Sequence, residues 1–99
     1  MKLNELTGNH FRPLIQSSVR VDMSGGEGLE LTLIEVADPF PAPAGQARRP
    51  FSLVYRGPLR RFLPQGLYPL AHPGLGTLEI FIVPVRQDAD GFIYQAVFN

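Results

Sequence analysis

The chain has no cysteine, which excludes disulfide bonds and thiolate metal sites. It also lacks any run of 18 apolar residues, so the sequence offers no candidate membrane-spanning helix. The first ten residues do not contain the apolar stretch of a signal peptide. We therefore expect a cytoplasmic protein without a membrane partner.

Charge is scarce as well. Charged residues make up 18% of the chain, against about 25% in an average soluble protein. The basic and acidic residues balance to a formal net charge of zero. A neutral protein lacks the long-range attraction that draws basic proteins to nucleic acids, so we expect no nucleic-acid partner.

Glycine and proline are abundant, with ten of each in 99 residues. They lie between short apolar runs, which is typical of many short strands joined by turns. A chain of this length forms one domain with a core of its own. We expect a single β domain over residues 1–99, with a helical turn in residues 1–16 and strands in residues 17–99.

The most apolar stretch is residues 76–85, where Glu79 is the only charged residue. Its apolar residues occupy both faces of a strand, so the strand is expected near the centre of a sheet or in a barrel wall. We therefore expect Ile80, Phe81 and Ile82 to supply both buried faces.

Alternating apolar residues predict five further strands. Within residues 29–36 the apolar positions change parity after Leu33, which indicates a bulge or a strong bend. Near the start, Thr7 is placed to N-cap a short helical turn that Pro13 limits. The prediction is a mainly β fold: a six-stranded antiparallel meander that closes as a barrel or rolled sheet. The other expected strands are residues 19–23, 29–36, 51–56, 67–70 and 92–98.

Two long connections carry the residues that we consider candidate partner contacts. Residues 38–50 contain four prolines, and Phe40 lies between two of them. Phe40 either plugs an open end of the barrel or projects to a partner. The second connection begins at Gly57 and carries Arg60 and Arg61. The strand between the two connections spans about 20 Å at 3.3 Å per residue. The pair Arg48-Arg49 therefore lies far from Arg60-Arg61, and the two pairs do not form one basic patch. The candidate contacts are Phe40, Arg48, Arg49, Arg60, Arg61 and Phe62.

The sequence contains only weak matches to catalytic and metal-binding motifs. Residues 88–91, Asp-Ala-Asp-Gly, resemble the middle of a calcium loop, but no acidic residue follows where the last ligand should be. A hairpin turn explains them better, with aspartate bonding the backbone and Gly91 supplying positive φ. His10 and His72 have no second ligand at metal spacing, and we expect the His72 ring to bond a turn carbonyl. No serine lies in a nucleophile elbow. We expect no catalytic residue, metal or cofactor.

The later half of the chain contains four motifs rich in aromatic, aliphatic, glycine and proline residues: residues 51–58, 63–68, 72–85 and 94–99. Together these motifs resemble a family of small bacterial domains of unknown function. The early Phe11-Arg-Pro-Leu14 fits the start of that family's pattern. Members are often found beside proteins similar to phage tail-collar (microcystin-dependent) proteins, and the family has no assigned activity.

The sequence favours a non-enzymatic structural or protein-interaction module with a protein partner, and it leaves homo-oligomerisation open. The resemblance implies an accessory role in a phage-tail-like or adhesin assembly. The alternative is a small-molecule-binding barrel, in which Tyr55, Tyr68, Tyr94 and the phenylalanines would line a cavity.

Overall fold

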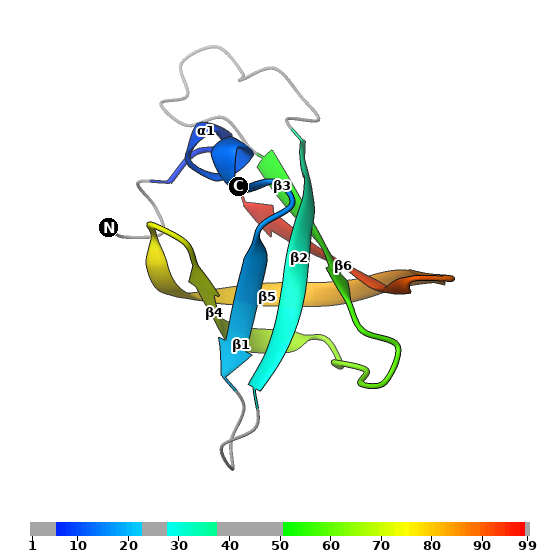
Figure 1. Cartoon of the computed structure of the whole chain (residues 1–99). Helices are drawn as coiled ribbons and strands as arrows, with labels where there is room; N and C mark the ends of the chain where they lie inside the picture. Colours follow the sequence, from blue (N-terminus) through cyan, green and yellow to red (C-terminus); the bar gives the residue numbers. More distant parts are fainter. Residues whose placement is uncertain (1–5, 23–27, 38–50, 99) are drawn as a thin grey trace.

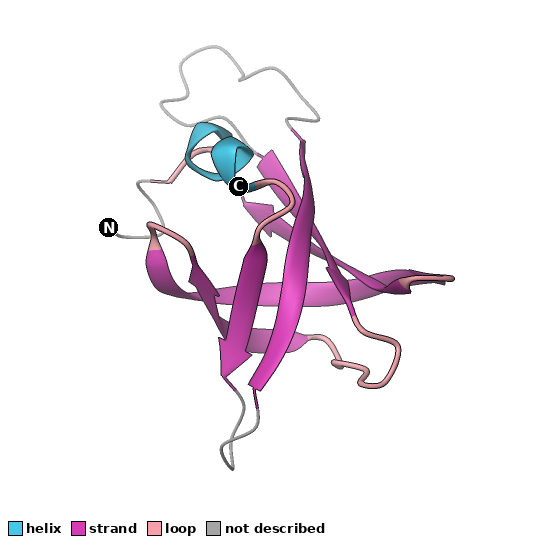
Figure 2. Cartoon of the chain, viewed as in Figure 1, coloured by secondary structure: helices cyan, strands magenta, loops and turns pink. Residues whose placement is uncertain are grey.

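The computed structural model describes residues 6–22, 28–37 and 51–98. Within these residues, six strands form a closed antiparallel barrel (Figures 1 and 2). This confirms the predicted mainly β fold, and of the two forms that the sequence left open, a barrel or a rolled sheet, the structure has the closed barrel. The strands are β1 (Ser18–Asp22), β2 (Gly28–Ala37), β3 (Phe51–Gly57), β4 (Gly66–His72), β5 (Gly76–Asp88) and β6 (Gly91–Phe98).

The order of the strands around the barrel is β1-β2-β3-β6-β5-β4, with β4 closing onto β1. The chain therefore forms two three-stranded meanders rather than the single meander expected from the sequence. The residues between β3 and β4 lead from one meander to the other, because β3 pairs with β6. Alternation of apolar residues reports which face of a strand is buried, but not which strands pair.

The parity change in β2 corresponds to a real irregularity. Leu33 pairs with Tyr55 of β3, whereas Glu35 pairs with Val54, so the register shifts between Leu33 and Glu35. A second shift lies in β5, between Pro84 and Arg86. Such bulges bend strands and increase their twist, which helps a small sheet to close. The predicted bulge in residues 29–36 is confirmed.

Strand β5 is buried on one face only. Leu78, Ile80 and Ile82 point into the barrel, whereas the Phe81 side chain is 52% exposed on the outer wall. The expectation that both faces are buried is wrong. A closed barrel gives each strand one inward face, and no second layer covers the outer face of β5 among the described residues.

The end of the barrel near the C-terminus of β6 is filled by the N-terminal helix (Figure 1). Helix α1 (Gly8–Phe11) continues as a 3-10 turn, η2 (Arg12–Leu14), and Thr7 is its N-cap as predicted. Phe11 is fully buried, with its ring centroid 5.8 Å from that of Phe51. Phe51 also stacks on Phe98 at 4.6 Å. Phe11 thus fills the position that a barrel plug would take, while Phe40 lies outside the described residues.

The β5–β6 hairpin extends beyond the barrel wall (Figure 2). Its turn is closed by Asp88, whose Oδ1 accepts hydrogen bonds from the backbone N–H groups of Asp90 (2.9 Å) and Gly91 (3.0 Å). This confirms the predicted hairpin turn. The expected positive φ at Gly91 is wrong. Glycine is required there because a Cβ would lie 2.1 Å from the Gly57 carbonyl oxygen.

Candidate functional site

The connection between β3 and β4 is held in place by two tyrosines. We call residues 58–65 the anchored loop. The Tyr94 hydroxyl, from β6, accepts a hydrogen bond from the backbone N–H of Leu63 at 3.0 Å. The Tyr68 hydroxyl, from β4, donates to the Pro64 carbonyl at 2.7 Å. Because Leu63 is itself fully buried, the loop is fixed to the end of the barrel from inside.

The anchored loop presents apolar side chains to solvent. Leu59 is 45% exposed and Phe62 is 48% exposed. The Phe62 ring packs edge-on against Phe92 of β6, with 5.2 Å between ring centroids. Large exposed apolar side chains on a well-positioned loop are a feature of protein-binding surfaces.

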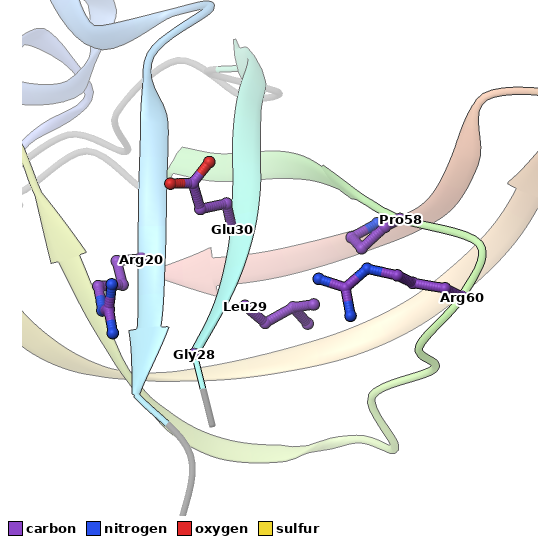
Figure 3. Close-up of a pocket in the computed structure, with 6 residues that line it drawn as sticks. All are labelled: Arg20, Gly28, Leu29, Glu30, Pro58 and Arg60. Atoms are coloured by element: carbon purple, nitrogen blue, oxygen red, sulfur yellow. The ribbon is translucent and has the colours of Figure 1, made fainter. Parts of the chain in front are cut away.

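Beside the loop lies a groove with a volume of about 510 Å³. In Figure 3 the Arg60 side chain extends from the anchored loop toward β2, which carries Leu29 and Glu30. The groove is lined by Arg20, Gly28, Leu29, Glu30, Pro58 and Arg60. The groove therefore lies between β1 and β2 on one side and the anchored loop on the other.

The two arginines of the groove differ in their partners. Arg20 Nε donates to Asp22 Oδ1 at 2.8 Å, and this bond raises the pKa of Arg20. The guanidinium lies over Gly28, where a Cβ would come within 2.7 Å of Arg20 Nη2. Arg60 is exposed and has no ion pair with any residue in the described part of the chain.

Glu30 is the acidic member of the groove. It pairs in register with Arg20 across β1 and β2, and both side chains are exposed on the outer face. Among the described residues, Glu30 forms no ion pair within 4 Å. Within the described part of the chain, the groove therefore holds one guanidinium, of Arg60, and one carboxylate, of Glu30, that form no ion pair within 4 Å.

The predicted contact residues divide between the two connections. Arg60, Arg61 and Phe62 all lie in the anchored loop, and Arg60 lines the groove. The other three candidates, Phe40, Arg48 and Arg49, lie outside the described residues.

Sequence reasoning did not find the other charged members of the groove, Arg20 and Glu30. The alternation in residues 19–23 places Arg20 on the solvent face of its strand. Its position beside the anchored loop depends on which strands pair around the barrel, and no local pattern reports that.

A buried polar pair lies inside the barrel, away from the groove. The Tyr55 hydroxyl lies 2.8 Å from His72 Nε2, and His72 Nδ1 lies 3.2 Å from the Leu70 carbonyl oxygen. The Phe11 ring contacts the imidazole edge-on at 5.4 Å. His72 therefore bonds a carbonyl of its own strand, β4, rather than of the turn that follows. Burial raises the pKa of Tyr55 and lowers that of His72.

Two of the tyrosines proposed to line a ligand cavity are packed in the core. Tyr55 and Tyr94 are fully buried, and each hydroxyl bonds a protein group. Tyr68 is half-buried and its hydroxyl holds the anchored loop. The hydroxyls of all three tyrosines therefore bond other groups of the protein.

No group of three or more histidine, aspartate or glutamate side chains in residues 6–22, 28–37 and 51–98 is arranged to hold a metal ion. No helix in the same part of the chain has the length and apolar character needed to cross a membrane.

Comparison with known proteins shows the family of the chain. The sequence profile of a domain of unknown function (DUF6916) matches residues 6–98, so the chain belongs to that family. No curated protein and no solved structure matches the chain.

Proposed function

We propose that this member of the DUF6916 family is a non-enzymatic protein-interaction module that binds its partner through the anchored loop. The observation that carries the proposal is the exposure of Leu59 and Phe62 on a loop held by two tyrosine hydrogen bonds, one buried and one exposed. A loop fixed before binding loses little conformational entropy when a partner covers it. Aromatic and aliphatic side chains with this exposure provide the apolar centre of an interface.

The partner assembly that we propose is phage-tail-like or adhesin-like, with this protein as an accessory. Support for this part comes from the resemblance to domains found beside tail-collar-like proteins. A small barrel that presents the anchored loop in a fixed conformation suits an accessory protein that binds a larger one.

The alternative, a small-molecule-binding barrel, has less support. Its expected lining includes Tyr55 and Tyr94, which are engaged in the packed core. The groove has a volume within the range of ligand pockets, about 300–1,000 Å³. However, those pockets are mainly apolar, whereas Arg20, Glu30 and Arg60 contribute half of the residues that line this one.

Affinity capture from an extract of the native host tests the proposal. The bait is the full chain, and the test variant carries Leu59→Ser and Phe62→Ser. Val97→Ser is the control, because Val97 is a 61% exposed apolar residue that pairs with Ser52 near the opposite end of the barrel. All three baits should give the same circular dichroism spectrum.

We expect wild type and the control to capture the same protein in stoichiometric amount, and the loop variant to lose it. The complex should then form again from the two purified proteins. Capture that survives the loop substitutions, or the absence of any stoichiometric partner, would refute the role proposed for the anchored loop.

A further inference from the structure

The groove beside the anchored loop has an uneven distribution of charge. The Arg20 guanidinium is engaged by Asp22, and Glu30 lies opposite Arg20 on the neighbouring strand. Arg60, on the other side of the groove, has no such partner among the described residues. Pro58, next to Arg60 on the anchored loop, provides exposed apolar lining, whereas the Leu29 side chain is almost wholly buried in the core (Figure 3).

We propose that this groove binds an extended segment of a partner polypeptide that places one carboxylate against Arg60. This inference rests on the proposed function and names the chemistry of the partner. A guanidinium presents two parallel N–H donors that match the two oxygens of a carboxylate. An aliphatic side chain next to the acidic residue would contact Pro58, which is half-buried.

The acidic groups around the groove favour a peptide over a nucleic acid or a phosphorylated ligand. A phosphate backbone would place dense negative charge near Glu30 and Asp22. Arg20 would offset little of that charge, because Asp22 already engages it. A peptide can place one carboxylate at Arg60 and direct a backbone N–H or a basic side chain toward Glu30.

The backbone that carries Arg60 is held on both sides of that residue. Pro58 restricts the backbone where the loop leaves β3, and the Leu63 amide is held by Tyr94. The Arg60 side chain is thus presented from a fixed backbone, which reduces the entropy lost when it forms an ion pair.

A displayed library of random linear 12-residue peptides tests the proposal with the full chain as target. We expect selection to enrich peptides in which aspartate or glutamate is next to leucine, isoleucine or valine. A synthetic peptide of the most enriched sequence is then measured by fluorescence anisotropy. Its affinity should fall as salt is raised, because the ion pair is exposed to solvent.

Variants locate the bound peptide. Arg60→Glu should weaken binding about tenfold or more, since it replaces an attraction by a repulsion. Arg60→Lys should weaken binding less, because it keeps the charge and loses the paired donors. Arg86→Glu is the matched control, since Arg86 is an exposed arginine on the β5–β6 hairpin. It changes the net charge equally and should leave the affinity unchanged.

The proposal would be overturned if no peptide is enriched, if basic peptides are enriched, or if Arg60→Glu and Arg86→Glu bind the peptide equally well. Tighter binding of a phosphopeptide or single-stranded DNA at Arg60 would also overturn it, since the groove would then take another ligand class. If capture of the host protein is unchanged by Arg60→Glu but is lost when Phe62 is substituted, the peptide-binding role of the groove would be refuted. The proposed interaction through the anchored loop would stand. If peptide binding depends on Arg60 but no host protein is captured, the groove proposal would stand and the proposed interaction with a host partner would be refuted.

Discussion

The buried contact between Tyr55 and His72 assigns a protonation state to the imidazole. His72 Nδ1 faces the Leu70 carbonyl oxygen and therefore carries the hydrogen, which leaves Nε2 to accept from the Tyr55 hydroxyl. A second proton on the ring would reverse the bond to Tyr55, leave the tyrosine hydroxyl hydrogen without its acceptor, and place a charge inside the barrel. The neutral imidazole is thus the form that fits the folded protein.

This arrangement predicts a loss of stability in mild acid. Burial lowers the pKa of His72 below its ordinary value of 6.5, and the bond to the Leu70 carbonyl opposes that shift only in part. The unfolded chain therefore binds a proton that the folded chain does not, so the free energy of unfolding falls as pH drops below about 6.5. Well above that pH the imidazole is neutral in both the folded and the unfolded chain, so His72 does not reduce the stability there.

Urea denaturation between pH 5 and pH 8 measures this effect. His72→Gln removes the titrating group, so the variant should show a flatter dependence on pH than the wild type. An unchanged slope in the variant would assign the acid sensitivity to other groups.

Two adjacent residues of β5 should respond very differently to truncation. Ile82 is fully buried and faces the core, whereas Phe81 is half exposed on the outer wall. We expect Ile82→Ala to cost about 2–5 kcal/mol. Phe81→Ala should cost no more than about 1 kcal/mol, the typical value of a cross-strand pair such as that with Leu67.

Chemical denaturation of the two variants side by side checks this contrast. An equal loss of stability would mean that the outer face of β5 is covered in solution, by a second copy or another part of the chain. A fully soluble and stable Ile82→Ala variant would contradict the inward placement of β5.

At the scale of elements, the anchored loop depends on a bond that crosses from β6. The Leu63 N–H is buried, and the Tyr94 hydroxyl is its acceptor. Tyr94→Phe removes that acceptor and leaves a buried donor unpaired, at a cost of about 1–3 kcal/mol. Tyr68→Phe is the comparison, since its bond to Pro64 is exposed and water can replace the lost donor.

Amide hydrogen exchange by NMR should show the local effect. The Leu63 amide is expected to exchange faster in Tyr94→Phe and to stay close to wild type in Tyr68→Phe. Comparable acceleration in both variants would indicate that the loop opens as one unit whichever tyrosine is removed.

The strands themselves could be predicted because their patterns are local. The alternation around Val19 and Val21 and the parity change after Leu33 both correspond to observed features. The prediction failed at Phe81, since apolar residues on both faces of a strand imply two covered faces only when a second layer exists. Here the barrel closes on itself, and a large aromatic residue remains on its outer wall.

At the scale of the whole molecule, the groove depends on strand order. Arg60, Arg61 and Phe62 are consecutive, so a sequence pattern could single them out. Arg20 and Glu30 come beside Arg60 only because β3 pairs with β6, which sends the anchored loop across the barrel end. That pairing is decided by the packing of all six strands together, and no short segment specifies it.

The barrel does not close equally firmly on all sides. Among the described residues, the pairing between β1 and β4 is limited to Arg20 with Ala71 and Val21 with Leu70. Every residue of β3, by contrast, pairs with β6. Because few hydrogen bonds cross the β1–β4 seam, it should open locally at a free energy below that of global unfolding.

Native-state hydrogen exchange at rising denaturant concentration tests the seam. Amides that bond across β1 and β4 should exchange with a weak dependence on denaturant, since opening the seam exposes little surface. Amides shared by β3 and β6 should exchange only through global unfolding and follow the full denaturant slope. If the two sets converge on one slope and one free energy, the barrel unfolds as a single unit and the seam is not a weak point. If the seam amides exchange first, β1 separates from β4 while β3 stays paired with β6, and Arg20 moves away from β4 before the core is lost.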